Sequence, residues 1–175
     1  MTKTSILRHG TRAAFLTLAL STPALCQTVP PVSDTVSLSG PRFGMTVLSE
    51  GVVSKLKSED ISVGSVVSQF GWQFEKQFYS SQTGPTAVTE CVLLVGGLDQ
   101  GVVLPSLSWL VGVRTKEGAE IGVGPNVTPV GVALAIATGI TVRAGALNVP
   151  VNLAVVPSRS GVRVSILSGF NLRRR

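Results

Sequence analysis

Polar and large apolar side chains alternate along residues 66–78, and this alternation constrains the fold more than any other feature of the chain. One face of the segment would carry Val66, Ser68, Phe70, Trp72, Phe74 and Phe78. The other face would carry Gln69, Gly71, Gln73, Glu75 and Gln77. A period of two is the repeat of a β-strand, because successive side chains of a strand point to opposite sides. Lys76 breaks the pattern on the apolar side, but the segment still predicts a strand with one apolar and one polar face.

Short segments of the same kind continue from Pro41 to Leu172 and are separated by residues that favour turns. Gly, Pro, Asn, Asp and Ser are frequent in the separating stretches, of which residues 124–126 (Gly-Pro-Asn) are one example. The expected strands are residues 42–48, 66–78, 87–95, 106–115, 119–123, 130–143, 147–156 and 161–172. Residues 49–64 are a polar excursion with room for one short helical turn. Such regularly spaced short strands predict an all-β domain.

About eight antiparallel strands with short connections admit two architectures, and we expect the first of them. The strands either close into an up-and-down β-barrel or form a two-sheet β-sandwich. Residues 87–95 and 130–138 are apolar on both faces, which favours strands that are buried on two sides, as in the core of a sandwich. The alternation elsewhere fits both folds, so the sandwich stays open as the alternative.

Charged residues inside the expected strands are the candidate functional residues of the domain. They are Glu75, Arg114, Glu120, Arg143 and Arg163. Each is out of phase with the large apolar residues of its own strand, so we expect it to point to the opposite face. On a water-soluble sandwich that face meets solvent, whereas in a small membrane barrel it turns inward as a paired polar filling. The same residues are therefore either solvent-facing charges or the lining of a polar lumen.

The segmentation resembles that of a known class of bacterial membrane proteins. Strand lengths of about ten residues, and a last strand that ends in Phe170 and Leu172, are similar to those of the small eight-stranded outer-membrane β-barrel proteins of Gram-negative bacteria. The strings QFGWQFEKQF, LPSLSWLVGVRT and NVPVNLAVVPSRSGVRVS also resemble an uncharacterised group of exported bacterial β-proteins. The first resemblance implies an outer-membrane location, with membrane lipid as the partner of the apolar face.

The N-terminal residues predict export from the cytoplasm. Lys3, Arg8 and Arg12 precede an apolar run at residues 13–20, and small residues surround Pro23. This order is that of a secretory signal peptide, and the apolar run is too short for a membrane-spanning helix. We expect a signal peptide at residues 1–26, a flexible leader at 27–40, the β-barrel-like domain at 41–172 and a basic tail at 173–175. Export directs the protein to the cell envelope, either to the outer membrane or, as the alternative, to the periplasm or the cell exterior.

Charge and the scarcity of reactive residues exclude several function classes. The chain has a formal net charge of +6, but residues 27–172 contain nine basic and nine acidic side chains. We therefore expect no nucleic-acid partner, because a neutral body has no basic patch to follow a phosphate backbone. The one histidine, His9, lies in the expected signal peptide, which removes a Ser-His-Asp triad and a His metal site. We expect Cys91 to be a buried free thiol, with pairing to Cys26 as the alternative.

These observations predict a non-enzymatic envelope protein without a cofactor or a bound metal. The expected function is that of a small outer-membrane β-barrel with a structural or interaction role. The alternative is a soluble periplasmic or secreted β-domain that binds a small apolar ligand or a protein partner. The oligomeric state stays open.

Overall fold

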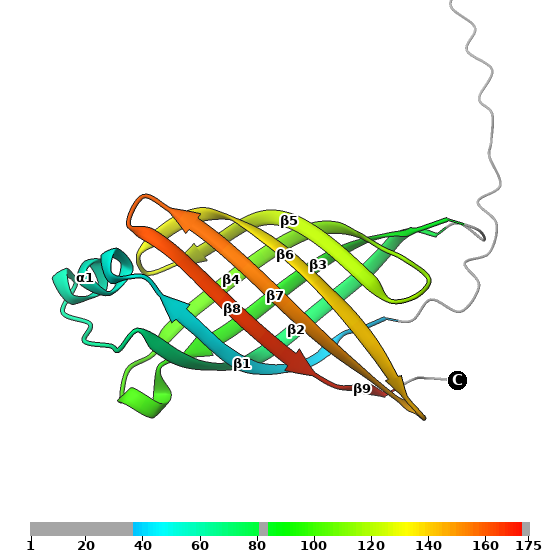
Figure 1. Cartoon of the computed structure of the whole chain (residues 1–175), viewed down its shortest axis with the longest axis horizontal. Coiled ribbons are helices and arrows are strands. Elements are labelled where there is room, and N and C mark those ends of the chain that lie inside the picture. The colour runs from blue at the N-terminus through cyan, green and yellow to red at the C-terminus, as the bar shows by residue number, and fades with distance from the viewer. Residues whose placement is uncertain (1–36, 81–83, 173–175) are drawn as a thin grey trace, which may run out of the picture. The chain divides into compact units, whose positions relative to one another are not determined.

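The computed structural model describes residues 37–80 and 84–172, and within them eight long strands close into one barrel (Figure 1). The strands are β1 (Gly40–Leu48), β2 (Val66–Ser80), β3 (Thr86–Gly96), β4 (Leu104–Arg114), β5 (Ala119–Thr128), β6 (Gly131–Ala144), β7 (Leu147–Ser158) and β8 (Gly161–Gly169). The shorter elements are the helix α1 (Glu50–Ser58), the 3-10 helix η1 (Leu98–Gln100) and the strand β9 (Asn171–Leu172). The expected signal peptide, residues 27–36 of the expected leader and the basic tail lie outside the described residues.

Each long strand pairs antiparallel with its neighbour in sequence, and β8 also pairs with β1, which closes the ring. In this closing pair, Gly44 lies opposite Leu167 and Thr46 lies opposite Ser165. β9 follows β8 after Phe170 and pairs with the first residues of β7. The prediction of an all-β, antiparallel, up-and-down barrel of about eight strands is confirmed, and the alternative of a two-sheet sandwich is wrong.

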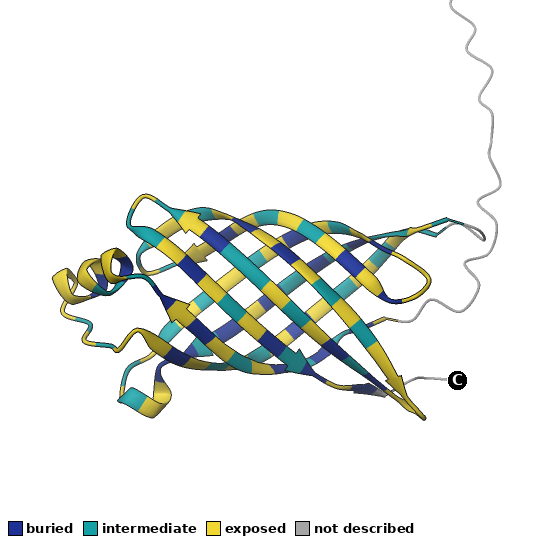
Figure 2. Ribbon diagram, in the orientation of Figure 1, coloured by how far each residue is buried: buried dark blue, intermediate teal, exposed yellow. Residues whose placement is uncertain are grey.

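The barrel turns most of its large apolar side chains outward, and its interior holds polar side chains, small ones and several valines and leucines. On β2, Phe70, Trp72 and Phe74 are 53%, 46% and 55% exposed, whereas Gln73 is 3% exposed. Figure 2 shows the same alternation of exposed and less exposed positions along the other strands. A water-soluble protein has the reverse arrangement, with its large apolar side chains in the core.

The two segments that are apolar on both faces follow this arrangement too. In β6, Ala135 and Ala137 point into the barrel and are buried, whereas Leu134 and Ile136 point outward and are exposed. In β3 the outward Leu93 is exposed as well. The expectation that both faces of these strands are buried is wrong. Because the interior of an eight-stranded barrel is narrow, small side chains such as alanine can fill it while the large ones remain outside.

β5 is longer than the sequence predicts, because residues 124–126 continue the strand and do not form a turn. The pairing between β4 and β5 is interrupted around Pro125, which has no N–H group to donate to a neighbouring strand. A Cβ atom at Gly124 would lie 1.8 Å from the carbonyl oxygen of Trp109, so the close approach of the two strands there requires glycine. Residues 124–126 favour turns by type, but here they form a tightly packed stretch of β5.

The two ends of the barrel differ in their connections. At one end, which we call the loop end, residues 49–65 join β1 to β2 and residues 97–103 join β3 to β4. At the other end, the terminus end, β1 begins, β8 ends, and residues 115–118 and 145–146 form short connections. α1 lies at the loop end (Figure 1) and has nine residues, which is longer than the single turn that the sequence predicts. Among the described residues, no helix has the length and apolar character that crossing a bilayer would require.

Apolar side chains cover the loop end of the barrel interior, or lumen, and one apolar residue is buried at the terminus end. At the loop end, Val52 and Leu56 of α1 are 0% and 3% exposed and pack with Leu48 and Val67 of the strands. Their spacing of four residues brings them to one face of the helix. At the terminus end, Leu38 is 1% exposed. Leu38 falls within the expected leader, so the last residues of that segment belong to the folded domain.

Candidate functional site

A charge cluster fills the lumen toward the terminus end, with Arg114 of β4 at its centre. The Arg114 guanidinium donates from Nη1 to Glu75 Oε1 at 2.7 Å, and from Nε and Nη2 to Glu120 Oε2 at 2.9 and 2.8 Å. Arg114 Nη2 also lies 3.5 Å from Oε1 of Glu90. The four side chains are each at most 10% exposed, so one cation holds three carboxylates away from water. Charge-assisted hydrogen bonds of this kind are stronger than neutral ones.

Strand register brings these residues together. Arg114 and Glu120 lie opposite each other in the β4–β5 pair, and residues 115–118 make the turn that joins them. Glu75 of β2 lies opposite Glu90 of β3. Asn152 of β7 donates a hydrogen bond to Glu120 Oε1 and extends the network toward the far wall of the barrel.

Arg42 of β1 is a second buried cation near this cluster, and it is 1% exposed. It donates from Nε to Gln73 Oε1 at 2.9 Å, from Nη1 to the Pro41 carbonyl at 2.9 Å and from Nη2 to the Leu38 carbonyl at 2.6 Å. A Cβ atom at Gly169, its partner on β8, would lie 2.7 Å from Arg42 Nη1. The glycine therefore leaves the space that the arginine side chain occupies.

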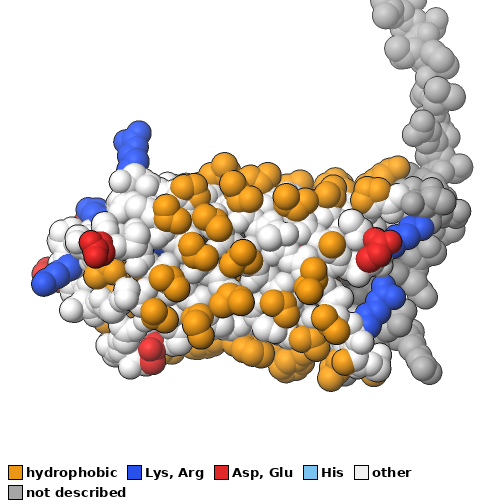
Figure 3. All heavy atoms as spheres, viewed as in Figure 1, with side chains coloured by type: hydrophobic (Ala, Val, Ile, Leu, Met, Phe, Trp, Pro, Cys, Tyr) orange, Lys and Arg blue, Asp and Glu red, His pale blue; other side chains and the backbone are white. Residues whose placement is uncertain are grey.

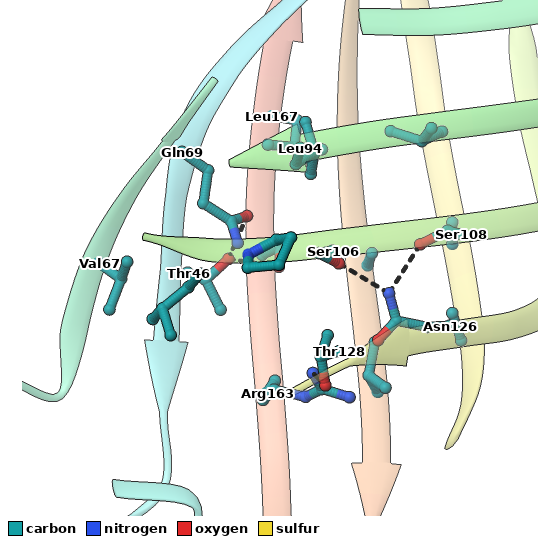
Figure 4. Close-up of a pocket in the computed structure, with 18 of the residues that line it drawn as sticks. Thr46, Val67, Gln69, Leu94, Ser106, Ser108, Asn126, Thr128, Arg163 and Leu167 are labelled. Atoms are coloured by element: carbon teal, nitrogen blue, oxygen red, sulfur yellow. Dashed lines mark hydrogen bonds between the residues drawn. The ribbon is translucent and has the colours of Figure 1, made fainter. Parts of the chain in front are cut away.

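The loop end of the lumen holds a different polar group, centred on Arg163 of β8. Arg163 is 7% exposed and donates from Nη1 to Thr128 Oγ1 on β5 at 2.8 Å. Two residues before Thr128, Asn126 donates from Nδ2 to Ser106 Oγ and to Ser108 Oγ, both at 2.9 Å. Figure 4 shows these side chains pointing into the pocket from different strands.

These residues line a cavity of about 90 Å³ inside the barrel. The polar side chains of its wall are Arg42, Thr46, Gln69, Gln73, Glu90, Ser106, Ser108, Asn126, Thr128, Asn152, Arg163 and Ser165. The rest of the wall is mostly apolar and includes Val52, Leu56, Leu94, Leu110, Ala135, Val156 and Leu167. The charged side chains in its wall are Arg42, Glu90 and Arg163, so the wall carries one net positive charge beside its apolar surface. α1 forms part of the wall at the loop end.

The structure places the five sequence-predicted charges in three situations. Glu75, Arg114 and Glu120 meet in the charge cluster, and Arg163 also points inward, but in the cavity at the loop end. Arg143 is exposed, because it is the next-to-last residue of β6 and lies at the terminus end, where neighbouring strands no longer enclose it. The interpretation as a polar lumen therefore fits four of the five residues, and Arg143 is a surface charge.

Sequence reasoning missed Arg42 and Glu90 of the buried group. Glu90 shares its face with Val88 and Val92, so the alternation of β3 does not reveal a polar face. The register of the hairpin that joins β2 and β3 would have placed it beside Glu75. Cys91 is a free thiol of intermediate exposure and lies between the inward-facing Glu90 and Val92, so the prediction that it is buried is wrong.

The outer surface carries what we call the apolar belt, a set of large exposed side chains on the strands. The belt includes Phe43, Met45, Val47, Phe70, Trp72, Phe74, Leu93, Leu107, Trp109, Val111, Ile121, Val123, Leu134, Ile136, Leu153, Val164 and Ile166. Among the described residues, exposed charged side chains occur in the connections or near the strand ends, as with Lys76 and Arg143. Figure 3 shows this separation on one face, with apolar groups over the body and charges at both ends.

Comparisons with known proteins add no relative: no protein-family model, no curated protein and no solved structure matches the chain. Among the described residues, no group of three or more His, Cys, Asp or Glu side chains is placed to hold a metal ion. The geometry of the barrel itself is therefore the basis for assigning a function.

Proposed function

We propose that the chain is a non-enzymatic, integral β-barrel of the bacterial outer membrane, with a structural or interaction role. One observation carries this proposal: the uncharged apolar belt surrounds a closed barrel whose buried charged residues face the lumen. Each large apolar side chain removed from water contributes about 1.5–3 kcal/mol, so a belt of this extent favours a hydrocarbon environment. The alternative of a soluble periplasmic or secreted domain would leave the whole belt in water.

Backbone geometry supports the same environment. A closed barrel satisfies its backbone hydrogen bonds internally, and it is one of two structures that can do so inside a bilayer. The strands range from nine residues in β1 to fifteen in β2. A tilted strand needs about 9–11 residues to cross a bilayer, so these lengths are sufficient. The expected signal peptide and the resemblance to outer-membrane barrels favour the outer membrane as the destination.

Orientation follows from the unequal ends. Barrels of the outer membrane have short periplasmic turns and longer external loops, so the terminus end would face the periplasm and α1 would lie at the cell surface. A barrel of eight strands has an interior just wide enough for side chains. The role is therefore structural, or an interaction through the residues of the loop end, and not passage through a wide channel.

Membrane fractionation tests the proposal directly. We expect the protein in the outer-membrane fraction. Washing with urea should leave it in the membrane, whereas detergent should extract it. We also expect a folded form that migrates differently from the boiled form in gels. Recovery of the folded protein in buffer without detergent would contradict the proposal and favour the soluble alternative.

A pair of substitutions tests whether the belt contacts lipid. Ile136→Arg introduces a charge in the middle part of β6, whereas Val103→Arg introduces the same charge in the connection before β4. An arginine at the bilayer midplane of a barrel costs about 2–4 kcal/mol, and one near the interface costs about 0–1 kcal/mol. We expect this difference in unfolding measurements in lipid bilayers. Equal effects of the two substitutions would contradict lipid contact.

A further inference from the structure

Arg163 is a buried cation for which the described residues provide no counter-charge. Its side chain reaches from β8 to Thr128 on β5, and Nη1 donates the hydrogen bond. Its Nε atom is buried without a hydrogen-bond partner, and no carboxylate of the described residues lies within 4.0 Å of its nitrogen atoms. A buried charge without a partner is costly, so such a residue needs an anion or water beside it.

The other two arginines of the lumen differ from Arg163 in this respect. Arg114 is bonded to two carboxylates and lies beside a third. Arg42 uses all three of its nitrogen atoms, on Gln73 and on the carbonyl oxygens of Pro41 and Leu38. Among the three, Arg163 alone borders the cavity with a nitrogen atom that has no partner.

We propose that the cavity at the loop end binds a small monocarboxylate, with Arg163 as the residue that recognises its carboxylate group. Because Nη1 is already bonded to Thr128, the remaining edge of the guanidinium is formed by Nε and Nη2. Two parallel N–H groups on one edge match the two oxygens of a carboxylate.

Hydroxyl groups near Arg163 can provide further donors. The oxygens of Ser106 and Ser108 accept hydrogen bonds from Asn126 Nδ2, so each hydroxyl keeps its own hydrogen for another acceptor. Both serines line the cavity together with Arg163. Figure 4 shows them on the same side of the pocket as Asn126 and Thr128. Two hydroxyl donors therefore accompany the guanidinium in a wall that also contains acceptor oxygens of Glu90 and Asn126.

Size, charge and wall chemistry define the class of ligand. A cavity of about 90 Å³ is smaller than one of about 150 Å³ that accommodates benzene, so it suits a ligand of a few heavy atoms. Arg42 and Glu90 of the wall have opposite charges, so Arg163 leaves one net positive charge, which matches one negative charge. Phosphate or sulfate dianions would bring an excess of charge. The apolar wall near Leu94, Leu110 and Ala135 suits a short alkyl group. Acetate and propionate have these properties.

Thermal unfolding of the full chain with propionate and with propionamide tests the proposal without any substitution. The two molecules have nearly the same shape, but only propionate carries a charge. A ligand that binds the folded state raises the unfolding temperature with the logarithm of its concentration. We expect a saturable rise with propionate, at constant ionic strength, and none with propionamide. The experiment uses detergent or plain buffer, whichever keeps the protein folded, so its result does not depend on the membrane proposal.

Two arginine substitutions then assign the site. Arg163→Gln removes the proposed anchor, whereas Arg143→Gln makes the same change at an exposed position of the terminus end. Loss of a hydrogen-bonded charge pair corresponds to about tenfold weaker binding or more, so Arg163→Gln should weaken propionate binding at least that much. Arg143→Gln should bind as the unmodified protein does. If Arg163→Gln does not fold, backbone amide NMR shifts near Ser106 and Ser108 on addition of propionate provide the same test. Equal stabilisation by propionamide, equal binding by Arg163→Gln, or no saturable binding would overturn the proposal.

Discussion

The two ends of the lumen differ in the groups that surround their buried arginines. Toward the terminus end, Arg114 is surrounded by Glu75, Glu90 and Glu120, so opposite charges meet inside the protein. Toward the loop end, Arg163 has a hydroxyl partner, a cavity and the apolar side chains of α1 nearby. The comparison indicates that the first end is built for stability and that the second leaves room for a ligand. Opposite responses to similar substitutions would establish this difference.

The largest effect should come from Arg114→Met. This substitution keeps an apolar side chain of similar length but leaves three buried carboxylates without their shared cation. Removing one partner of a buried ion pair costs about 3–5 kcal/mol, and we expect at least that loss in the free energy of unfolding. Denaturant unfolding in detergent or lipid measures it.

A compensating variant checks the cause of that loss. Adding Glu75→Gln and Glu120→Gln to Arg114→Met removes two of the three carboxylates that have lost their counter-charge. Most of the lost stability should therefore return. A loss below about 1 kcal/mol for Arg114→Met alone, as exposed charges give, would contradict the description of the cluster as a buried network.

A smaller effect should distinguish the carboxylates within the cluster. Glu120 accepts hydrogen bonds from Arg114 and Asn152, so Glu120→Gln should cost about 1–3 kcal/mol. Glu90 lies 3.5 Å from Arg114 and shares the site with two other carboxylates. Since Glu90→Gln relieves repulsion between like charges, its effect should stay within about 1 kcal/mol. Unfolding measurements on the two isosteric variants give the loss in the free energy of unfolding for each. A larger loss for Glu90→Gln than for Glu120→Gln would contradict this prediction.

The smallest effect should come from Arg163→Met at the loop end. In a buffer without carboxylates the substitution removes a buried cation that has no counter-charge, so the protein should become more stable by up to about 1 kcal/mol or stay unchanged. The same denaturant experiment that is used for Arg114→Met gives the comparison. A loss above about 2 kcal/mol would mean that the two ends are alike, and that Arg163 has a structural counter-charge.

Local alternation predicted most of the barrel, and it failed where neighbouring strands decide the outcome. The inward phase of Arg114, Glu120 and Arg163 follows from the period of two in each strand. Arg143 has the inward phase too, but its burial depends on how far the adjacent strands extend. The sequence of a single strand does not give that length. Glu90 lies among valines on its own strand, and only the register with β2 brings it to Glu75.

Turn residues were the other source of error. Gly124 and Pro125 favour a turn by local preference. In the structure they continue β5, because the close approach of β4 leaves no room for a side chain at Gly124. α1 was underestimated for a similar reason: the burial of Val52 and Leu56 depends on their packing with β1 and β2 at the loop end. In both places contacts between elements decide the local conformation.

The closing pair of the barrel has a consequence for folding. Every pairing among the eight long strands of the described chain joins neighbours in sequence, except the pairing of β1 with β8. That one contact brings residues 40–48 to residues 161–169. Forming it therefore costs the conformational entropy of closing a long loop. Before it forms, β1 and β8 present open edges, and open edges can pair with other chains. The growing structure therefore remains prone to self-association until its last long strand is in position.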